Sequence, residues 1–210
     1  MAGESPETKR HWLEFVAPIL MCVTTLASAW CSFQSSRWSG HGSDLSAQAD
    51  RLQRTAAALH VESQQIEAAQ LHVAMQAINA QLQGDDKVAR FYIERMPGEL
   101  KAAWDKWLAL HPFDNPSAPP HPFSPELYTP PLKDEIHRDL SEAAQATAQS
   151  NNDATHAGSY LRLTVLWAMV LFFTGMAGTF RKQVVRRSAL ACAVALWAYA
   201  FVRMLMTPVI

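Results

Sequence analysis

Histidine and acidic side chains are the residues of this chain that could do chemistry, and their spacing favours no catalytic or metal site. Eight histidines are present. His60 and His72 lie about 120° apart around a predicted helix, so they cannot bind one ion within a chain. His111 and His121, beside Asp114, could meet in a proline-rich segment, but zinc ligands usually have tighter spacings. We therefore predict no metal site.

Catalytic motifs are also missing from the sequence. It contains no Gly-rich phosphate loop, no His-Glu-x-x-His, no Cys-x-x-Cys and no Gly-x-Ser-x-Gly. We expect no catalytic residue, no cofactor and no enzymatic activity. One alternative stays open, a membrane-anchored enzyme or metal-binding protein that uses His111, Asp114 and His121.

Three uncharged apolar segments indicate a membrane protein. They run from about Phe15 to Phe33, from Leu163 to Phe180 and from Ser188 to Val202. About 20 residues in a helix cross a hydrocarbon core of about 30 Å. Ala27-Ser28-Ala29 resembles a signal-peptide cleavage site, but the first apolar segment is longer than a typical signal peptide requires, so we expect a retained span.

Basic residues predict the orientation of these spans. Lys9 and Arg10 precede the first span, and Arg181, Lys182, Arg186 and Arg187 lie between the second and third. Both places should be cytoplasmic by the positive-inside rule, which leaves the middle of the chain outside. That middle, residues 34–158, has 16 acidic and 10 basic residues, a net charge of −6. An acidic domain outside the cytoplasm argues against nucleic-acid binding.

A heptad pattern follows the first span and predicts a long helix. Residues 43–83 contain neither Pro nor Gly. Large apolar residues recur every seven positions, and the companion positions are small or polar. The large series is Leu45, Leu52, Leu59, Ile66 and Val73, closed by Ala80, and the companions are Ala49, Ala56, Ser63, Gln70 and Ala77.

A returning helix from about Lys133 is predicted to pack against this long helix as an antiparallel hairpin. Its stripe also includes small residues, as expected for closely packed helices. The predicted stripe is Ile136, Leu140, Ala143, Thr147, Ser150, Ala154, Ala157 and Leu161.

The predicted cap between the two legs contains short helices within 87–110 and a proline-rich loop over 111–131. Eight of the twelve prolines lie in that loop, which excludes helix and central strand. Trp104 and Trp107 share one helical face. We favour a core role for this face, and the alternative is an interaction surface, because paired tryptophans are common in binding hot spots.

Small residues in the spans predict close helix packing, within one chain or between chains. Thr24, Ser28 and Ser32 form a stripe in the first span, and Gly175 and Gly178 lie in the second.

The segment that leaves the first span carries a resemblance. Trp30, Phe33, Gln34, Arg37 and Trp38 match the pattern Ala-Trp-x-x-Tyr/Phe-Gln-x-x-x-Trp. In this, and in its later proline-rich segment and paired C-terminal spans, the chain resembles a family of uncharacterised small bacterial integral membrane proteins. The resemblance implies one span, a helical domain and two further spans, and it implies no activity. Gln34, Arg37 and Trp38 become interaction candidates, and Gln34 and Arg37 could bind lipid headgroups or a neighbouring helix.

These observations predict an all-α protein of the bacterial inner membrane with its N-terminus in the cytoplasm. We expect a non-enzymatic protein that presents a helical interaction domain in the periplasm, as a homo-oligomer or an accessory subunit. Its partners would be lipid and either itself or another membrane protein. The alternative is an oligomeric channel or small-solute pathway. The predicted segments are 1–11 (cytoplasmic), 12–33 (span 1), 34–158 (domain, with helices over 34–83 and 133–158), 159–180 (span 2), 181–187 (basic loop), 188–206 (span 3) and 207–210 (tail).

Overall fold

The computed structural model describes residues 6–180 and 182–210, with side chains from residue 17 onward. The predicted all-α class is confirmed, since the described residues form helices and no strand. Residues 1–5 of the predicted N-terminal segment and Arg181 of the predicted basic loop lie outside the described residues. The helices are α1 (Pro6–Leu82), α2 (Asp86–Ile93), α3 (Gly98–Leu108), α4 (Lys133–Thr179) and α5 (Gln183–Met206).

Helix α1 joins the predicted first span and the predicted long helix without a break. It ends where the sequence places a stop signal. Gly84 has a φ of +73°, a left-handed conformation that glycine adopts at little cost. The Asp85 carboxylate then accepts a hydrogen bond of 3.1 Å from the Val88 amide and caps α2.

Three of the described helices, α1 from Ala17 onward, α4 and α5, are long and apolar enough to cross a membrane. The apolar stretch of α1 has a mean hydropathy of 1.2, lower than the 1.6 of α4 and the 1.8 of α5. Many large apolar side chains in these helices face outward, among them Leu26, Phe172 and Val184, which are 72%, 61% and 79% exposed.

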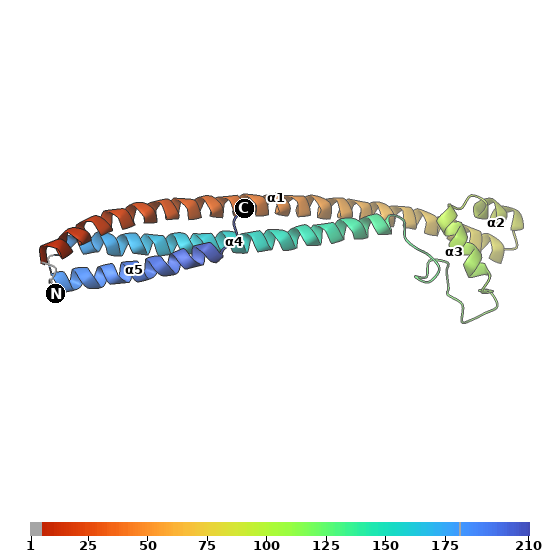
Figure 1. The fold of residues 1–210 in the computed structure, drawn as a ribbon. Coiled ribbons are helices and arrows are strands. Elements are labelled where there is room, and N and C mark those ends of the chain that lie inside the picture. Colours follow the sequence, from red (N-terminus) through yellow and green to blue (C-terminus); the bar gives the residue numbers. More distant parts are fainter. Residues whose placement is uncertain (1–5, 181) are drawn as a thin grey trace. The chain divides into compact units, whose positions relative to one another are not determined.

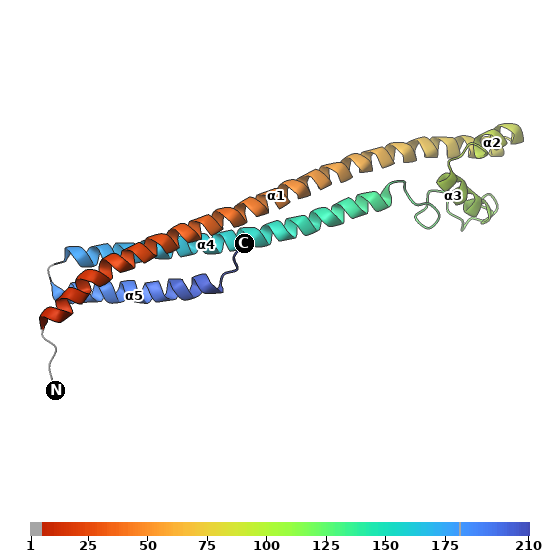
Figure 2. The same ribbon diagram turned by 45° about the horizontal axis from the view of Figure 1, so that its top comes forward.

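The chain divides into two compact units, which we describe separately. Unit 1 comprises Met1–Gln48 and Gln145–Ile210, and unit 2 comprises Ala49–Ala144. In unit 1, Figures 1 and 2 both show α5 alongside the second half of α4. Aromatic residues of α4 and alanines of α5 fill the core of unit 1. Its buried members are Cys31, Tyr160, Leu163, Trp167, Val170, Ala193 and Ala200.

Small and polar residues form the buried side of α1, which we call the inner stripe. The predicted large positions from Leu45 to Val73 are only half-buried, and it is their companions that are fully buried. Small buried residues let two helix backbones approach closely. The inner stripe repeats every seven residues and consists of Ser35 (half-buried), Gly42, Ala49, Ala56, Ser63, Gln70 and Ala77.

Gly42 marks a close approach of α1 and α4 in unit 1. A Cβ atom at Gly42 would lie 3.2 Å from the Asp153 Cβ and 3.3 Å from the Ser150 carbonyl oxygen. The Ser150 hydroxyl donates a hydrogen bond of 2.7 Å to the Gly42 carbonyl. Seven residues earlier on α1, Ser35 donates likewise to the Ala157 carbonyl at 3.0 Å.

The predicted stripe of the returning helix is wrong at half of its positions. Leu140, Thr147, Ala154 and Leu161 are exposed, and the residue before each of them is buried instead. The buried residues are Asp139, Ala146, Asp153 and Tyr160. The shift has a physical cause, because two aspartates lie on the buried side of α4 and an apolar pattern does not count them.

Unit 2 has its own core, built from α1, α2 and α3. The cap helices place Trp104 and Trp107 against Ala74 and Ala77 of α1. Residues 109–132, between α3 and α4, form turns, bends and irregular backbone with neither helix nor strand. Tyr128 of this segment is nonetheless buried, so the segment contributes to the core.

Replacing Gly42 should destabilise unit 1, whereas the same change at Gly40 should not. We expect Gly42→Leu to lower the free energy of unfolding by about 1–3 kcal/mol, because the side chain overpacks the contact with α4. Gly40→Leu is the matched control, since nothing lies within 4 Å of a Cβ at Gly40. Circular dichroism of both variants during thermal unfolding in detergent measures this. Equal melting temperatures would contradict the close packing at Gly42.

Candidate functional site

Two of the three residues singled out after the first span bind the segment that follows α5. Gln34 is 1% exposed, and its Oε1 atom accepts a hydrogen bond of 3.3 Å from the Ile210 amide. The Trp38 Nε1–H donates to the Pro208 carbonyl at 3.2 Å. Trp38 also packs against a neighbouring helix, since its ring centroid lies 4.7 Å from that of His156 on α4. Arg37 is exposed.

Tyr160 of α4 completes this arrangement, which we call the tail clamp: Gln34, Trp38 and Tyr160. Its phenol lies within hydrogen-bond distance of two carbonyl oxygens, 3.3 Å from Thr207 and 3.0 Å from Pro208. All of these contacts hold backbone atoms of residues 207–210. The clamp therefore attaches the end of α5 to α1 and α4 with no requirement for particular side chains in the tail.

Three residues beyond Trp38, a histidine–aspartate pair lies between α1 and α4. The His41 Nδ1 and Asp153 Oδ2 atoms are 2.6 Å apart. The Asp153 side chain is buried, while that of His41 is 54% exposed. A buried carboxylate requires a donor, and His41 supplies it. The pair therefore has a structural role in the contact between the two helices.

Trp104 and Trp107 are both buried, so the predicted core role holds and the alternative of an exposed interaction surface is wrong. Their ring centroids are 5.3 Å apart. The Trp107 Nε1–H donates to the Pro119 carbonyl at 2.7 Å, which ties the proline-rich segment to α3. The Trp104 Nε1 atom is buried with no hydrogen-bond partner among the described residues.

The small residues of the spans differ in their surroundings. Thr24 is buried and donates to the Leu20 carbonyl of its own helix at 2.6 Å. Ser28 is half-buried and Ser32 is exposed. Gly175 and Gly178 are exposed, with nothing within 4 Å of a Cβ built on either. Of the five, Thr24 and Ser28 thus contribute to packing inside the chain.

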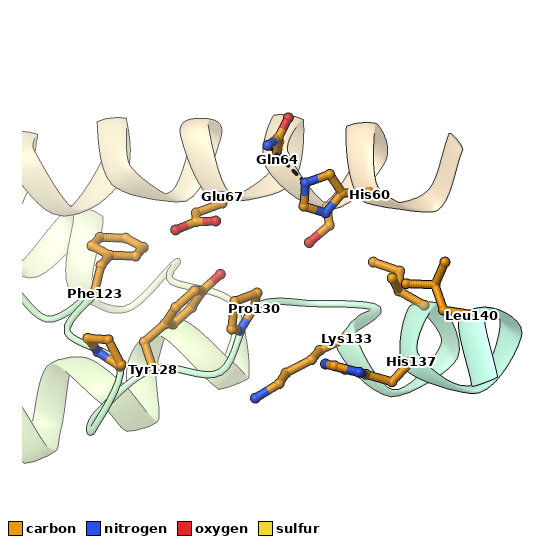
Figure 3. Close-up of a pocket in the computed structure, with 12 residues that line it drawn as sticks. His60, Gln64, Glu67, Phe123, Tyr128, Pro130, Lys133, His137 and Leu140 are labelled. Carbon is orange, nitrogen blue, oxygen red and sulfur yellow. Dashed lines mark hydrogen bonds between the residues drawn. The ribbon is translucent and has the colours of Figure 1, made fainter. Parts of the chain in front are cut away.

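Unit 2 has a groove between α1, the proline-rich segment and the start of α4, which we call the cap groove. It has a volume of about 590 Å³ and is open to solvent. Figure 3 shows Glu67 with Phe123 and Tyr128 at one end. Lys133 and His137 lie toward the other end, as does His60. The groove therefore has an acidic and aromatic end and a basic end.

Tyr128 forms the floor of the acidic end. It is 4% exposed, and its hydroxyl donates to the Gln70 Oε1 atom at 2.7 Å. Burial raises the pKa of the Tyr128 phenol to about 12, and the negative charges of Glu67 and Glu99 add to the increase. Nearby, Ser63 donates to the Pro131 carbonyl at 2.7 Å. Two polar residues of the inner stripe thus fix the wall of the groove.

The sequence contained a partial signal for this groove. His60 and Glu67 are seven residues apart on one side of α1, and Lys133 and His137 are four apart on α4. Nothing in the sequence shows that these two pairs approach each other, because the proline-rich segment separates them. In the described part of the chain no three His, Cys, Asp or Glu side chains are grouped to hold a metal. The groove is therefore a candidate binding surface built from mixed charges, aromatic rings and prolines.

Comparison with protein-family models, curated proteins and solved structures gives no match for this chain.

Removing the Tyr160 hydroxyl should loosen the tail. We expect exchange of the Thr207, Val209 and Ile210 amide hydrogens to become faster in Tyr160→Phe, by roughly tenfold if the lost bonds contribute about 1.4 kcal/mol. Tyr199→Phe, at an exposed tyrosine of α5, is the control. Unchanged exchange in Tyr160→Phe would show that the clamp does not hold the tail.

Removing the Tyr128 hydroxyl should change how stability depends on alkaline pH. A phenol whose pKa is raised in the folded state favours folding below pH 10, and this contribution is lost as the pH rises to about 12. We expect Tyr128→Phe to cost about 1–2 kcal/mol near neutral pH, because Gln70 loses its donor, and to weaken the decline in stability at alkaline pH. Chemical unfolding across the pH range measures both effects. Tyr92→Phe is the control, and equal pH profiles of Tyr128→Phe and the unmodified protein would contradict the assignment.

Proposed function

We propose that this chain is a non-enzymatic integral membrane protein of the bacterial inner membrane that presents unit 2 outside the cytoplasm as an interaction domain. It acts as a homo-oligomer or as an accessory subunit of a membrane complex. We also propose that the chain belongs to the family of small bacterial membrane proteins that its sequence resembles. In the same proposal, α1 and α4 pack as an antiparallel hairpin.

Outward-facing apolar side chains on helices of sufficient length support the membrane part of this proposal. Leu26 and Phe172 would contact lipid. The basic residues Lys182, Arg186 and Arg187 at the start of α5 support a cytoplasmic position for that end. The order of contacts in unit 1, with Ser35 at Ala157 and Gly42 at Ser150, supports antiparallel legs.

The cap groove is the observation that supports the role of unit 2 as an interaction domain. It brings the charged side chains of Glu67 and Lys133 together with the aromatic rings of Phe123 and Tyr128 in one unit. Mixed polar and aromatic surfaces of this kind are typical of binding sites.

Thiol labelling in intact cells tests the membrane orientation. We expect a membrane-impermeant maleimide to label Ala69→Cys, at an exposed position of unit 2, without permeabilisation. Gln183→Cys, exposed at the start of α5, is the matched variant and should be labelled only after permeabilisation. Both are made in a background with Cys22, Cys31 and Cys192 replaced by alanine. The reverse labelling pattern would overturn the orientation.

The mass of the complex, purified in mild detergent from its native membrane, tests the interaction role. More than one copy per particle, or a second protein at constant stoichiometry, is the expected result. A particle with a single copy and no second protein would contradict the proposal.

A further inference from the structure

Another side of α1 is apolar and largely uncovered by the described residues of unit 2. Its residues recur at alternating intervals of three and four, which is the spacing of a second heptad face. Val61, Leu71, Met75 and Leu82 are 53%, 41%, 43% and 68% exposed. We call this face the outer stripe. It comprises Val61, Gln64, Ala68, Leu71, Met75, Ile78 and Leu82; of these, Ile78 is half-buried against the core of unit 2, and Gln64 also lines the cap groove.

The segment that carries the outer stripe is depleted in charge. From Ser63 to Gln83 the only formally charged residue is Glu67, although charged residues make up 18% of the chain. The preceding turns of the same helix are charged, with Asp50, Arg51, Arg54 and Glu62. Depletion of charge around exposed apolar residues is typical of the centre of a protein interface and not of a helix that faces only water.

We propose that two copies of this chain associate in parallel through the outer stripe. The inference rests on the proposed membrane function, because two copies inserted in one membrane share their direction and their depth. Their α1 helices are then parallel and level, so each residue of the stripe meets the same residue of the other copy. A heptad face is complementary to itself in this arrangement.

The residues that flank the stripe permit this pairing. In a parallel coiled coil, heptad position g of one helix lies beside position e of the partner helix, five residues further along the sequence. Glu67 then lies beside the partner's His72, and His60 lies beside the partner's Gln65. No two like formal charges are opposed, so the second copy meets no electrostatic barrier at this face.

Disulfide cross-linking in native membranes tests the pairing. In the cysteine-free background, we expect an oxidant to link Val61→Cys and Met75→Cys into dimers, since parallel symmetry brings each thiol to its own counterpart. Ala69 is exposed on the same helix but points away from the stripe, so Ala69→Cys should remain monomeric. Equal cross-linking at position 69, or none at 61 and 75, would overturn the proposal.

A charge placed in the stripe provides a second readout. Met75→Glu opposes two carboxylates and should raise the dissociation constant of the dimer at least about tenfold, which corresponds to about 1.4 kcal/mol. Ala69→Glu is the control for an added carboxylate and should leave the constant unchanged, and circular dichroism shows whether both variants fold. The unmodified dimer and the two variants are compared by mass in mild detergent.

The possible outcomes separate this inference from the proposed function. If Met75→Glu releases a different protein from the complex, the stripe binds a heterologous partner and the self-association is wrong. If Met75→Cys cross-links but Ala69→Cys is labelled only after permeabilisation, the pairing stands and the proposed orientation fails. A dimer that persists unchanged in Met75→Glu would place the interface elsewhere.

Discussion

A buried carboxylate restricts how α1 and α4 can pack in unit 1. Asp153 lies inside the helix contact and has its donor in His41, 2.6 Å away on α1. A buried carboxylate that loses its hydrogen-bond donor is destabilised, so rotations of α4 that separate this pair are disfavoured. Once Asp153 faces α1, residues at intervals of seven must do so too. Ala146, Tyr160, Trp167 and Thr174 are all buried as a result.

The tail clamp gives a physical reason for the pattern of residues that ends the first apolar segment. A glutamine and a tryptophan four positions apart lie on one side of a helix, so both can reach the same passing stretch of backbone. Gln34 accepts from an amide and Trp38 donates to a carbonyl, which are complementary roles that a peptide segment can satisfy together. Arg37 lies between them in sequence and is exposed.

Much of the fold could be predicted from the hydrophobic periodicity and from the residues that end and start helices, but the cap groove could not. The absence of Pro and Gly from 43 to 83, with Gly84 and Asp85 after it, correctly predicts one helix end and the next helix start. Heptad spacing identifies which residues of α1 share a side, yet hydropathy alone does not show that the small members are the buried ones. On α4 the same reasoning fails at Asp153, because the partner that makes burial possible is more than a hundred residues away. The cap groove depends on contacts across a proline-rich segment whose path has no periodic signal.

The contact between Gln34 and Ile210 has a consequence for the order of events during biosynthesis. These residues are 176 positions apart, so Gln34 emerges from the ribosome long before the backbone that satisfies it. Until α5 has been made and has taken its place, the carboxamide of Gln34 and the indole N–H of Trp38 need temporary partners, such as water or the insertion machinery. Chains that stop short of α5 would lack the backbone that pairs with these polar groups, so the side chains of Gln34 and Trp38 distinguish chains with α5 in place from chains without it.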